Sequence, residues 1–478
     1  MLVFGEDYRE NVRAFDGYVG VGKNFDVLKK VLKIGSTDEL TLYFIDGFVK
    51  DAVMQKLMMH FSSVQKLERT PDAAVRFADA NVPYVEVDVT EDTSMMTMML
   101  LSGASIVLGS TFGKSAVIID SRTYPARETA EPESDKVLRG AHDGFVETLI
   151  FNTALVRRRI RDVSLRTVYR SIGKASCTDV VMMYMEGRAD ASVVSDIQKK
   201  LDLVDTDNVS LGFQSLAESI IKTRWYNPFP KIRTTERPDV AAAQLLEGAV
   251  IVIVDNSPEV MLLPTSIFDF MQQTDDYYMP PFTGGYLRIL RHMTFLLSVI
   301  LTPLWYLLAT NTHLLSPAFE FIIPDEVRIP IIAQILIAEF MVDGLKLASL
   351  NTPSVLSSSL GAIAGLILGE FAVNIGFMSS HVVLIIAFVA ITNFTQASVE
   401  LGFAFKFMRL LLIFLSWFFS FAGFFVGLVL ICVLVATNKT VSGRRDYLYP
   451  LIPFNAKAMG RLLFRRKKSE PSYPRNQK

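Results

Sequence analysis

The pattern of hydrophobic and polar positions divides the chain into two contrasting halves. Before Pro280, short apolar runs alternate with charged stretches, as they do in a layered α/β protein. After Pro280, apolar runs of about 20 residues dominate, which is the length that a helix needs to cross a bilayer. The sequence therefore predicts an α/β soluble half followed by an all-α polytopic membrane domain.

The soluble half contains one pattern twice. In each copy an apolar strand ends in Asp46-Gly47 or Glu186-Gly187 and leads into a helix. Later in each copy a helix ends at Gly103 or Gly248, and two apolar runs follow with turn residues between them, as in a β-hairpin. The copies lie about 140 residues apart, and this spacing indicates two related subdomains and not a short-period repeat.

These patterns predict five segments along the chain. A polar stretch that contains Pro132 is typical of a linker. We expect a first α/β subdomain over 1–125, a linker over 126–140, a second α/β subdomain over 141–280, a transmembrane domain over 281–440 and a basic tail over 441–478.

Four apolar segments have the length of a membrane crossing, and they begin at Leu287, Val355, His381 and Phe407. The last is longer than one crossing requires, so it should tilt, bend near Gly423 or protrude. Basic residues favour the cytoplasmic side, and they occur at the start of the first segment, at Arg288 and Arg291, and again in the tail. Both ends inside means an even number of crossings, so we expect the fifth apolar segment, 329–349, to be a re-entrant or interfacial amphipathic helix.

Composition agrees with this division. Half of the 478 residues are hydrophobic, 34 of them are Phe, and the net charge is only −1. Cys177 and Cys432 do not suggest a disulfide framework, which favours a reducing compartment. The first residues lack a basic stretch followed by an apolar one, so we expect no cleavable signal peptide and a cytoplasmic soluble half.

No motif in the sequence predicts catalysis, a cofactor or a metal site. GSTFGKS, from Gly109, is one residue short of a phosphate-binding loop and precedes a strand-like run, so it favours a hairpin turn. The five histidines lack metal-ligand spacing, and no nucleophile has a base in a familiar arrangement. The basic cluster at 157–161 is typical of a solvated helix face. We therefore expect a non-enzyme without a cofactor and without a nucleic-acid partner.

The segment 329–349 carries three charges in an apolar context. Glu339, Asp343 and Lys346 share one helical face, and each intramembrane charge costs about 2.5–3.5 kcal/mol. Two interpretations stay open. The carboxylates form a cation-attracting ring around the axis of an oligomer, or they form internal salt bridges with Lys346.

A stripe of small residues marks the next segment. Gly361, Gly365 and Gly369 recur every four residues after a run of serines, and two polar side chains follow on the next turn. Such a stripe is typical of close helix packing or of a pore-lining helix in an oligomer. With the charged residues above, it predicts a candidate ion path formed by Glu339, Asp343, Lys346, Ser357, Ser358, Gly361, Gly365, Glu370 and Asn374.

Several motifs together resemble one known family. From Lys222 to Tyr278, NPFP, TERPD, LLEG and DDYY follow one another as in the segment that joins the soluble and membrane parts of GerA-type spore germinant receptor A subunits. AEFMVDGLK resembles the acidic membrane segment of that family, with Glu339 and Asp343 at carboxylate positions and Lys346 at a basic one. VGVGKNFDV and LYFIDGFVKD resemble its stage V sporulation AF branch, and the similarity covers nearly the whole chain.

This resemblance implies a multi-pass protein of the spore inner membrane, and the basic residues place both termini on the cytoplasmic, spore-core side. It implies an oligomeric ion channel that relays or amplifies the germination signal. The implied partners are membrane lipid, further copies of this chain, another spore membrane protein, and germinant receptor B and C subunits. A non-conducting scaffold and a secondary transporter stay open as alternatives, although a transporter usually carries its internal repeat in the membrane part.

Overall fold

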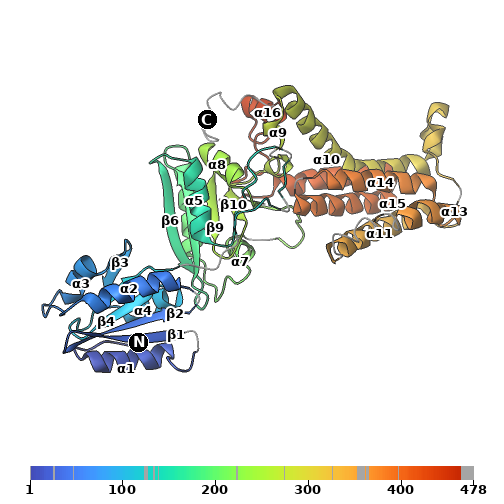
Figure 1. The fold of residues 1–478 in the computed structure, drawn as a ribbon. Coiled ribbons are helices and arrows are strands. Elements are labelled where there is room, and N and C mark those ends of the chain that lie inside the picture. Colours follow the sequence, from blue (N-terminus) through green and yellow to red (C-terminus); the bar gives the residue numbers. More distant parts are fainter. Residues whose placement is uncertain are drawn as a thin grey trace. The chain divides into compact units, whose positions relative to one another are not determined.

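The computed structural model describes residues 2–24, 27–46, 48–122, 128–132, 135–137, 139–221, 224–273, 275–325, 327–351, 361, 365–396 and 398–464. The chain forms two compact units, Met1–Glu128 and Thr129–Lys478. Figure 1 shows the elements of each unit. The second unit holds an α/β part and the helical part.

The first unit is an antiparallel sheet with helices on both faces. Its strands are arranged in the order β1-β2-β4-β5-β3. The elements are α1 (Tyr8–Val19), β1 (Val27–Ile34), β2 (Asp38–Ile45), α2 (Asp51–Ser63), α3 (Ala73–Asn81), β3 (Val87–Thr90), α4 (Thr93–Leu101), β4 (Ser105–Gly109) and β5 (Ala116–Ile119).

The second unit begins with the same arrangement. Its strand order, β6-β7-β9-β10-β8, matches that of the first sheet position by position. The elements are α5 (Leu149–Arg159), β6 (Leu165–Ile172), β7 (Thr178–Met185), α6 (Ala191–Asp202), α7 (Phe213–Ile220), β8 (Arg233–Thr235), α8 (Pro238–Leu246), β9 (Val250–Val254) and β10 (Val260–Leu263). The predicted duplication is confirmed.

Helices on both faces explain why the central strands are continuously apolar. In the first sheet, β4 and β5 are buried along their whole length, because Phe61 and Phe77 pack on one face and Phe15 and Met96 on the other. The GSTFGKS stretch connects these two antiparallel strands, so its interpretation as a hairpin turn is also confirmed.

One buried asparagine recurs in the first helix of each copy. The amide of Asn11 bonds both the N–H and the carbonyl of Gly5, each at 2.8 Å. The amide of Asn152 bonds the same two groups of Val146, at 2.8 and 2.6 Å. These helices were not part of the repeat that the sequence predicted, because their apolar faces are short and one polar residue in each is buried.

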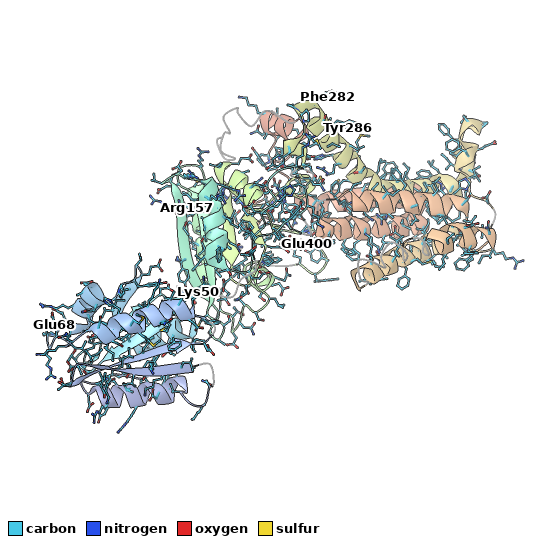
Figure 2. All side chains as sticks on the ribbon, in the orientation of Figure 1. Lys50, Glu68, Arg157, Phe282, Tyr286 and Glu400 are labelled. Carbon is cyan, nitrogen blue, oxygen red and sulfur yellow. The ribbon has the colours of Figure 1, made fainter. Side chains whose placement is uncertain are left out.

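The helical part follows β10 through a short turn. Its elements are η1 (Asp269–Met271), α9 (Asp275–Tyr278), α10 (Pro281–Thr310), η2 (Thr312–Leu314), η3 (Pro317–Ile322), α11 (Ile331–Asn351), the π-helix η4 (Leu366–Phe371), α13 (Ala372–Asn374), α14 (Ser380–Phe394), α15 (Val399–Ala436) and α16 (Ala456–Leu463). Phe282 and Tyr286 lie on the first turns of α10, and Glu400 lies on the first turn of α15 (Figure 2).

The four predicted crossings are not confirmed. Within the described parts of the chain, two helices are long and apolar enough to cross a membrane, Pro281–Thr310 and Val399–Ala436, and a shorter apolar helix covers Ser380–Asn393. The segment predicted to begin at Val355 lies partly outside the described residues, at 355–360 and 362–364. The expectation that 329–349 is re-entrant or interfacial stays a prediction, and α11 is the helix that covers most of this segment.

The longest helix, α15, reverses direction at Ser420. This residue has φ 52° and ψ −137°, which lies outside the helical region. A methyl group on Gly427 would lie 2.6 Å from Cδ2 of Leu412, so the arm 421–436 packs closely against the arm 399–419. The bend predicted near Gly423 is confirmed, and it is sharp enough to form a helical hairpin.

The reversal at Ser420 predicts that a glycine substitution there stabilises the protein, whereas glycine inside a helix usually destabilises it. Glycine tolerates positive φ, so Ser420→Gly should raise the free energy of unfolding by about 1 kcal/mol. Ser416→Gly, four residues earlier in regular helix, should lower it by about 1 kcal/mol. Thermal unfolding in detergent, followed by circular dichroism, measures both changes. Destabilisation of similar size by both substitutions would mean that α15 continues as a helix through Ser420.

Candidate functional site

A buried arginine–carboxylate pair lies at the centre of the helical part. Nε of Arg409, on α15, donates to Oε1 of Glu339, on α11, at 2.7 Å, and Nη2 donates to Oε2 at 2.9 Å. The Arg409 residue is 0% exposed and Glu339 is 5% exposed. Two parallel hydrogen bonds between opposite charges are a strong arrangement, and they offset the cost of burying both groups.

The same arginine also contacts a third helix. Nη1 of Arg409 donates to the backbone carbonyl of Ser298, on α10, at 2.8 Å. The Ser298 residue is fully buried, and Pro303 lies inside the same helix. Arg409 therefore connects α10, α11 and α15 through one guanidinium group.

Two further contacts join α11 and α15 in the same direction. Asp343 forms an ion pair with Lys406, and the ammonium of Lys346 lies 5.7 Å from the centre of the Phe403 ring. Successive partners move forward on α11, from 339 to 346, and backward on α15, from 409 to 403. The three contacts thus form an antiparallel ladder, which we call the charge ladder.

The partners in the charge ladder differ from those that the sequence suggested. The salt-bridge interpretation paired Glu339 with Lys346, whereas both oxygens of Glu339 bond Arg409. A signal was present, because Lys406 and Arg409 are two cations inside an apolar run. Such cations need counter-charges in a membrane domain, but their separation of some 70 residues from Glu339 hid the pairing.

The rest of the predicted ion path lies on other elements. Ser357 and Ser358 fall outside the described residues. Among the atoms that the structure describes, none lies within 4 Å of a Cβ built on Gly361 or Gly365, so these glycines are not packed against a described helix. Glu370, in the π-helix, and Asn374, in α13, are both exposed.

A second group of buried charges lies at the start of α10. Nη1 of Arg291 donates to Oδ2 of Asp276 at 2.7 Å, and Nε of Arg288 lies 3.6 Å from the same oxygen. Asp276 belongs to α9 and is fully buried. Arg288 and Arg291 were expected to act as positive flanks of a membrane helix. They are instead buried beside a carboxylate, so they give weaker support to the predicted orientation.

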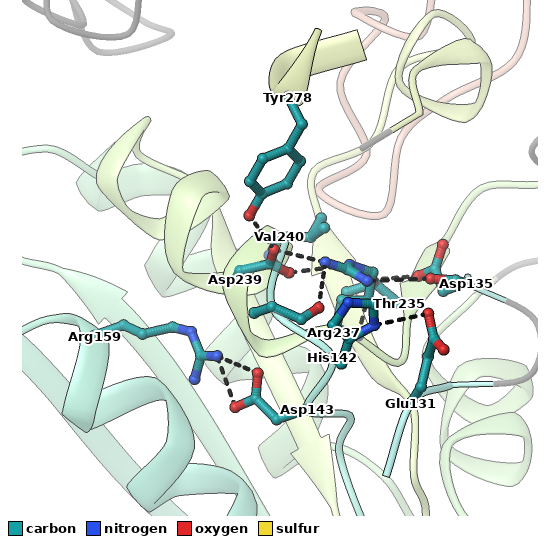
Figure 3. A network of polar contacts seen from close by, with 11 residues as sticks. Glu131, Asp135, His142, Asp143, Arg159, Thr235, Arg237, Asp239, Val240 and Tyr278 are labelled. Carbon is teal, nitrogen blue, oxygen red and sulfur yellow. Dashed lines mark hydrogen bonds and ion pairs between the residues drawn. The ribbon is translucent and has the colours of Figure 1, made fainter. Parts of the chain in front are cut away.

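The polar network in Figure 3 joins the expected linker to the second α/β part. Arg237 is 0% exposed, and its guanidinium pairs with Asp239 at 2.8 Å. The same group donates to the carbonyls of Asp135, at 3.4 Å, and Ala141, at 3.0 Å. The linker therefore lies against the α/β part of the second unit and is held there by one buried cation.

Tyr278 extends this network towards the start of α10. Its hydroxyl donates to Oδ2 of Asp239 at 2.8 Å, and a Cβ on Gly140 would lie 2.7 Å from its ring. Tyr278 belongs to α9, as does Asp276, which pairs with Arg291. A continuous series of contacts thus connects the linker with the first turns of α10.

The chain after α15 returns to the α/β part. Arg444 donates to Oδ2 of Asp190, the N-cap residue of α6, at 2.9 Å. Hydrogen bonds from Ser192, together with Arg444, lower the pKa of Asp190 to about 2. The hydroxyl of Tyr447 donates to the carbonyl of Pro230 at 2.8 Å. Both ends of the helical part therefore contact the same α/β part.

Two of the four arginines in the basic cluster at 157–161 contact nearby groups. Arg157, at the end of this helix (Figure 2), donates to the carbonyls of Asp162 and Leu165 at 3.3 and 3.2 Å. Arg159 pairs with Asp143. These contacts give the cluster a structural role where helix, linker and strand meet.

Comparisons with known proteins agree on one family. The family model described as Bacillus/Clostridium GerA spore germination protein matches residues 18–473. The chain is 37% identical over 459 residues to stage V sporulation protein AF of Bacillus subtilis (strain 168), covering 95% of this chain and 92% of that protein. It is 27% identical over 454 residues to spore germination protein KA of the same strain, covering 93% and 82%.

One solved structure also matches. It is the crystal structure of the N-terminal domain of the A subunit of the Bacillus megaterium spore germinant receptor GerK3. The match has 24% identity and a TM-score of 0.21, and it covers 55% of this chain and 96% of that one.

The pairing of Glu339 with Arg409 predicts that two single substitutions are worse than their combination. Glu339→Met or Arg409→Met alone leaves one buried charge and should cost about 3–5 kcal/mol of stability. The double variant removes both charges and should regain most of this loss. Melting temperature and size-exclusion profile in detergent measure the effect. Lys346→Met, which removes a cation that lies over a ring, serves as the milder control. A double variant no more stable than the worse single one would contradict the pairing.

The contact of Tyr278 with Asp239 predicts local opening when the hydroxyl is removed. Tyr278→Phe and Gly140→Ala should each raise hydrogen exchange in 139–145 and in α9, because one removes the bond and the other displaces the ring. Exchange in β9 and β10 should stay unchanged. Tyr286→Phe, at an exposed tyrosine on α10, is the matched control. Equal exchange in all variants would show that the linker and α9 are not coupled.

Proposed function

Because the chain belongs to the GerA family of spore germination proteins, we propose that it is a membrane subunit of a spore germination complex. In this proposal it forms an oligomeric ion channel that relays or amplifies the germination signal by releasing ions. It acts without catalysis in the spore inner membrane, with both termini on the spore-core side.

The charge ladder is the observation that carries this proposal. Buried ionisable residues in a membrane domain are costly and most often mark ion pathways or switching elements. Glu339, Asp343, Lys406 and Arg409 hold α11 and α15 in one register, because any slide of one helix separates both pairs. Two discrete registers of such a ladder would provide a closed and an open state.

The exposed small-residue stripe supports an oligomeric path. The glycines at 361 and 365 have no contacts from other described elements, and Glu370 is exposed a few residues later. In a symmetric oligomer, these glycines and Ser357 and Ser358 from every copy would gather around one axis. In that arrangement the stripe and Asn374 line the path, and the ladder controls its width.

The route of the signal follows the contacts described above. A movement of the first α/β unit reaches the linker, and the network of Arg237, Asp239 and Tyr278 passes it to Asp276 and the start of α10. The proposed partners are further copies of this chain, membrane lipid, another spore membrane protein, and germinant receptor B and C subunits.

One observation favours a second candidate function. The ion pairs are closed, and the pair of Glu339 with Arg409 is buried, so they could brace the helices without conducting anything. The protein would then be a non-conducting scaffold for germinant receptor complexes. Conductance separates the two candidates.

The test is the conductance of the purified complex in planar bilayers. Gly365→Leu should lower single-channel conductance by about tenfold while the mass of the complex is unchanged, because the side chain narrows the path. Gly344→Leu, at an exposed glycine on α11, adds equal bulk away from the proposed path and should leave conductance unchanged. An intact wild-type oligomer without conductance would reject the channel and favour the scaffold. Loss of the oligomer in Gly365→Leu would assign the stripe to packing.

A further inference from the structure

A short loop before β8 carries exposed aromatic side chains. Trp225 is 96% exposed, and Tyr226 is half exposed with its ring 5.9 Å from the indole in an edge-on arrangement. Tryptophan buries a large apolar area in most proteins, so exposure of nearly the whole side chain needs an explanation.

The loop is fixed to the helical part at the end of α15. The amide of Asn227 donates to the backbone carbonyl of Leu434 at 3.3 Å. Phe229 is buried, and its ring lies 6.0 Å from that of Phe405 on the other arm of the helical hairpin. One loop therefore contacts both arms of α15 close to the point where the apolar helix ends and the polar residues after Ala436 begin.

An apolar stripe leads along α15 to this loop. It consists of exposed side chains on the second arm, at i, i+3, i+4 and i+7 spacing, and ends beside Leu434. Its members are Val426, Val429, Leu430 and Val433. A continuous apolar stripe on the outside of a membrane helix is the surface that faces lipid, so Trp225 lies near the level where hydrocarbon gives way to headgroups.

Two cations, Arg224 and Lys231, belong to the same loop as the aromatic pair. Arg224 precedes Trp225, and burial together with Arg224 and Lys200 lowers the pKa of Lys231. Lys200 itself donates to the carbonyl of Ile220 at 3.2 Å. Arg224 and Lys231 thus place positive charge on the loop that carries the exposed aromatic pair, and positive charge attracts anionic groups.

We propose that this loop is a lipid-binding anchor, in which Trp225 and Tyr226 insert into the headgroup layer and Arg224 and Lys231 bind the phosphates of anionic lipids. Tryptophan and tyrosine favour the membrane interface, and juxtamembrane cations bind anionic headgroups with about 1 kcal/mol each. The inference goes beyond the proposed channel and does not depend on conduction. It places the second α/β sheet directly against the bilayer surface.

Quenching of Trp225 fluorescence tests the anchor in the full-length protein. The chain has three tryptophans, so Trp305→Phe with Trp417→Phe leaves Trp225 as the sole emitter. The probe is a lipid with a nitroxide on its headgroup, in nanodiscs of phosphatidylcholine with or without phosphatidylglycerol. Headgroup nitroxide should quench Trp225 by about half or more in the anionic discs. Arg224→Gln with Lys231→Gln should reduce this quenching in the anionic discs.

A tryptophan at the opposite edge of the sheet is the matched control. The register of the strands places the start of β8 level with the start of β6. The turn between β6 and β7 follows the end of β6, so it lies at the opposite end of the strands from the loop before β8. Lys174, on that turn, has a side chain that is 70% exposed. Lys174→Trp with Trp225→Phe, in the same background, should not be quenched.

Three results would overturn the proposal. The first is an absence of headgroup quenching while Trp225 emits at the wavelength of a solvent-exposed tryptophan. The second is equal quenching with and without phosphatidylglycerol. The third is a blue-shifted emission maximum of Trp225 without quenching by the lipid nitroxide. The last result would assign the loop to a contact with another protein chain. If the background substitutions prevent folding, the difference in quenching between the unmodified protein and Trp225→Phe gives the same answer.

Discussion

The ion pair between Glu339 and Arg409 is the interaction on which the helical part depends. Helices in lipid gain little from the hydrophobic effect, so close packing and polar contacts decide how they pair. Here one guanidinium bonds a carboxylate on α11 and a carbonyl on α10 while belonging to α15. Loss of this ion pair would leave an unpaired charge buried away from water. Asp343 with Lys406 repeats the contact one turn away, so the register of α11 on α15 is specified twice.

The helix α10 connects this core with the soluble part. On α10, Arg291 pairs with Asp276, and the carbonyl of Ser298 accepts a hydrogen bond from Arg409. Ser298 lies seven residues after Arg291, so both contacts are on the same face of α10. The contacts from the linker through Arg237, Asp239 and Tyr278 end at α9, which carries Asp276. The linker and the charge ladder are therefore connected through contacts on one helix, α10.

Several polar contacts join the α/β part of the second unit to the helical part. The loop at Asn227 bonds the end of α15, Tyr447 bonds Pro230, and Arg444 pairs with the cap of α6. The reversal at Ser420 makes this possible, because it returns both ends of a long apolar run to the same loop. The sheet of the second unit is therefore a platform beside the helices, and its exposed Trp225 marks the level of the bilayer surface.

The sequence by itself determined what depends on neighbours along the chain. Apolar runs bounded by turn residues identified both hairpins, the position of Gly103 and Gly248 revealed the duplication, and successive motifs identified the GerA family. Only the tertiary structure decided which charges meet. Glu339 shares a helical face with Lys346, yet its partner is a residue of another helix, and Arg288 and Arg291 turned out to be buried beside Asp276. The reason is physical, because periodicity reports which face a residue occupies and contains no information on which helix packs against that face.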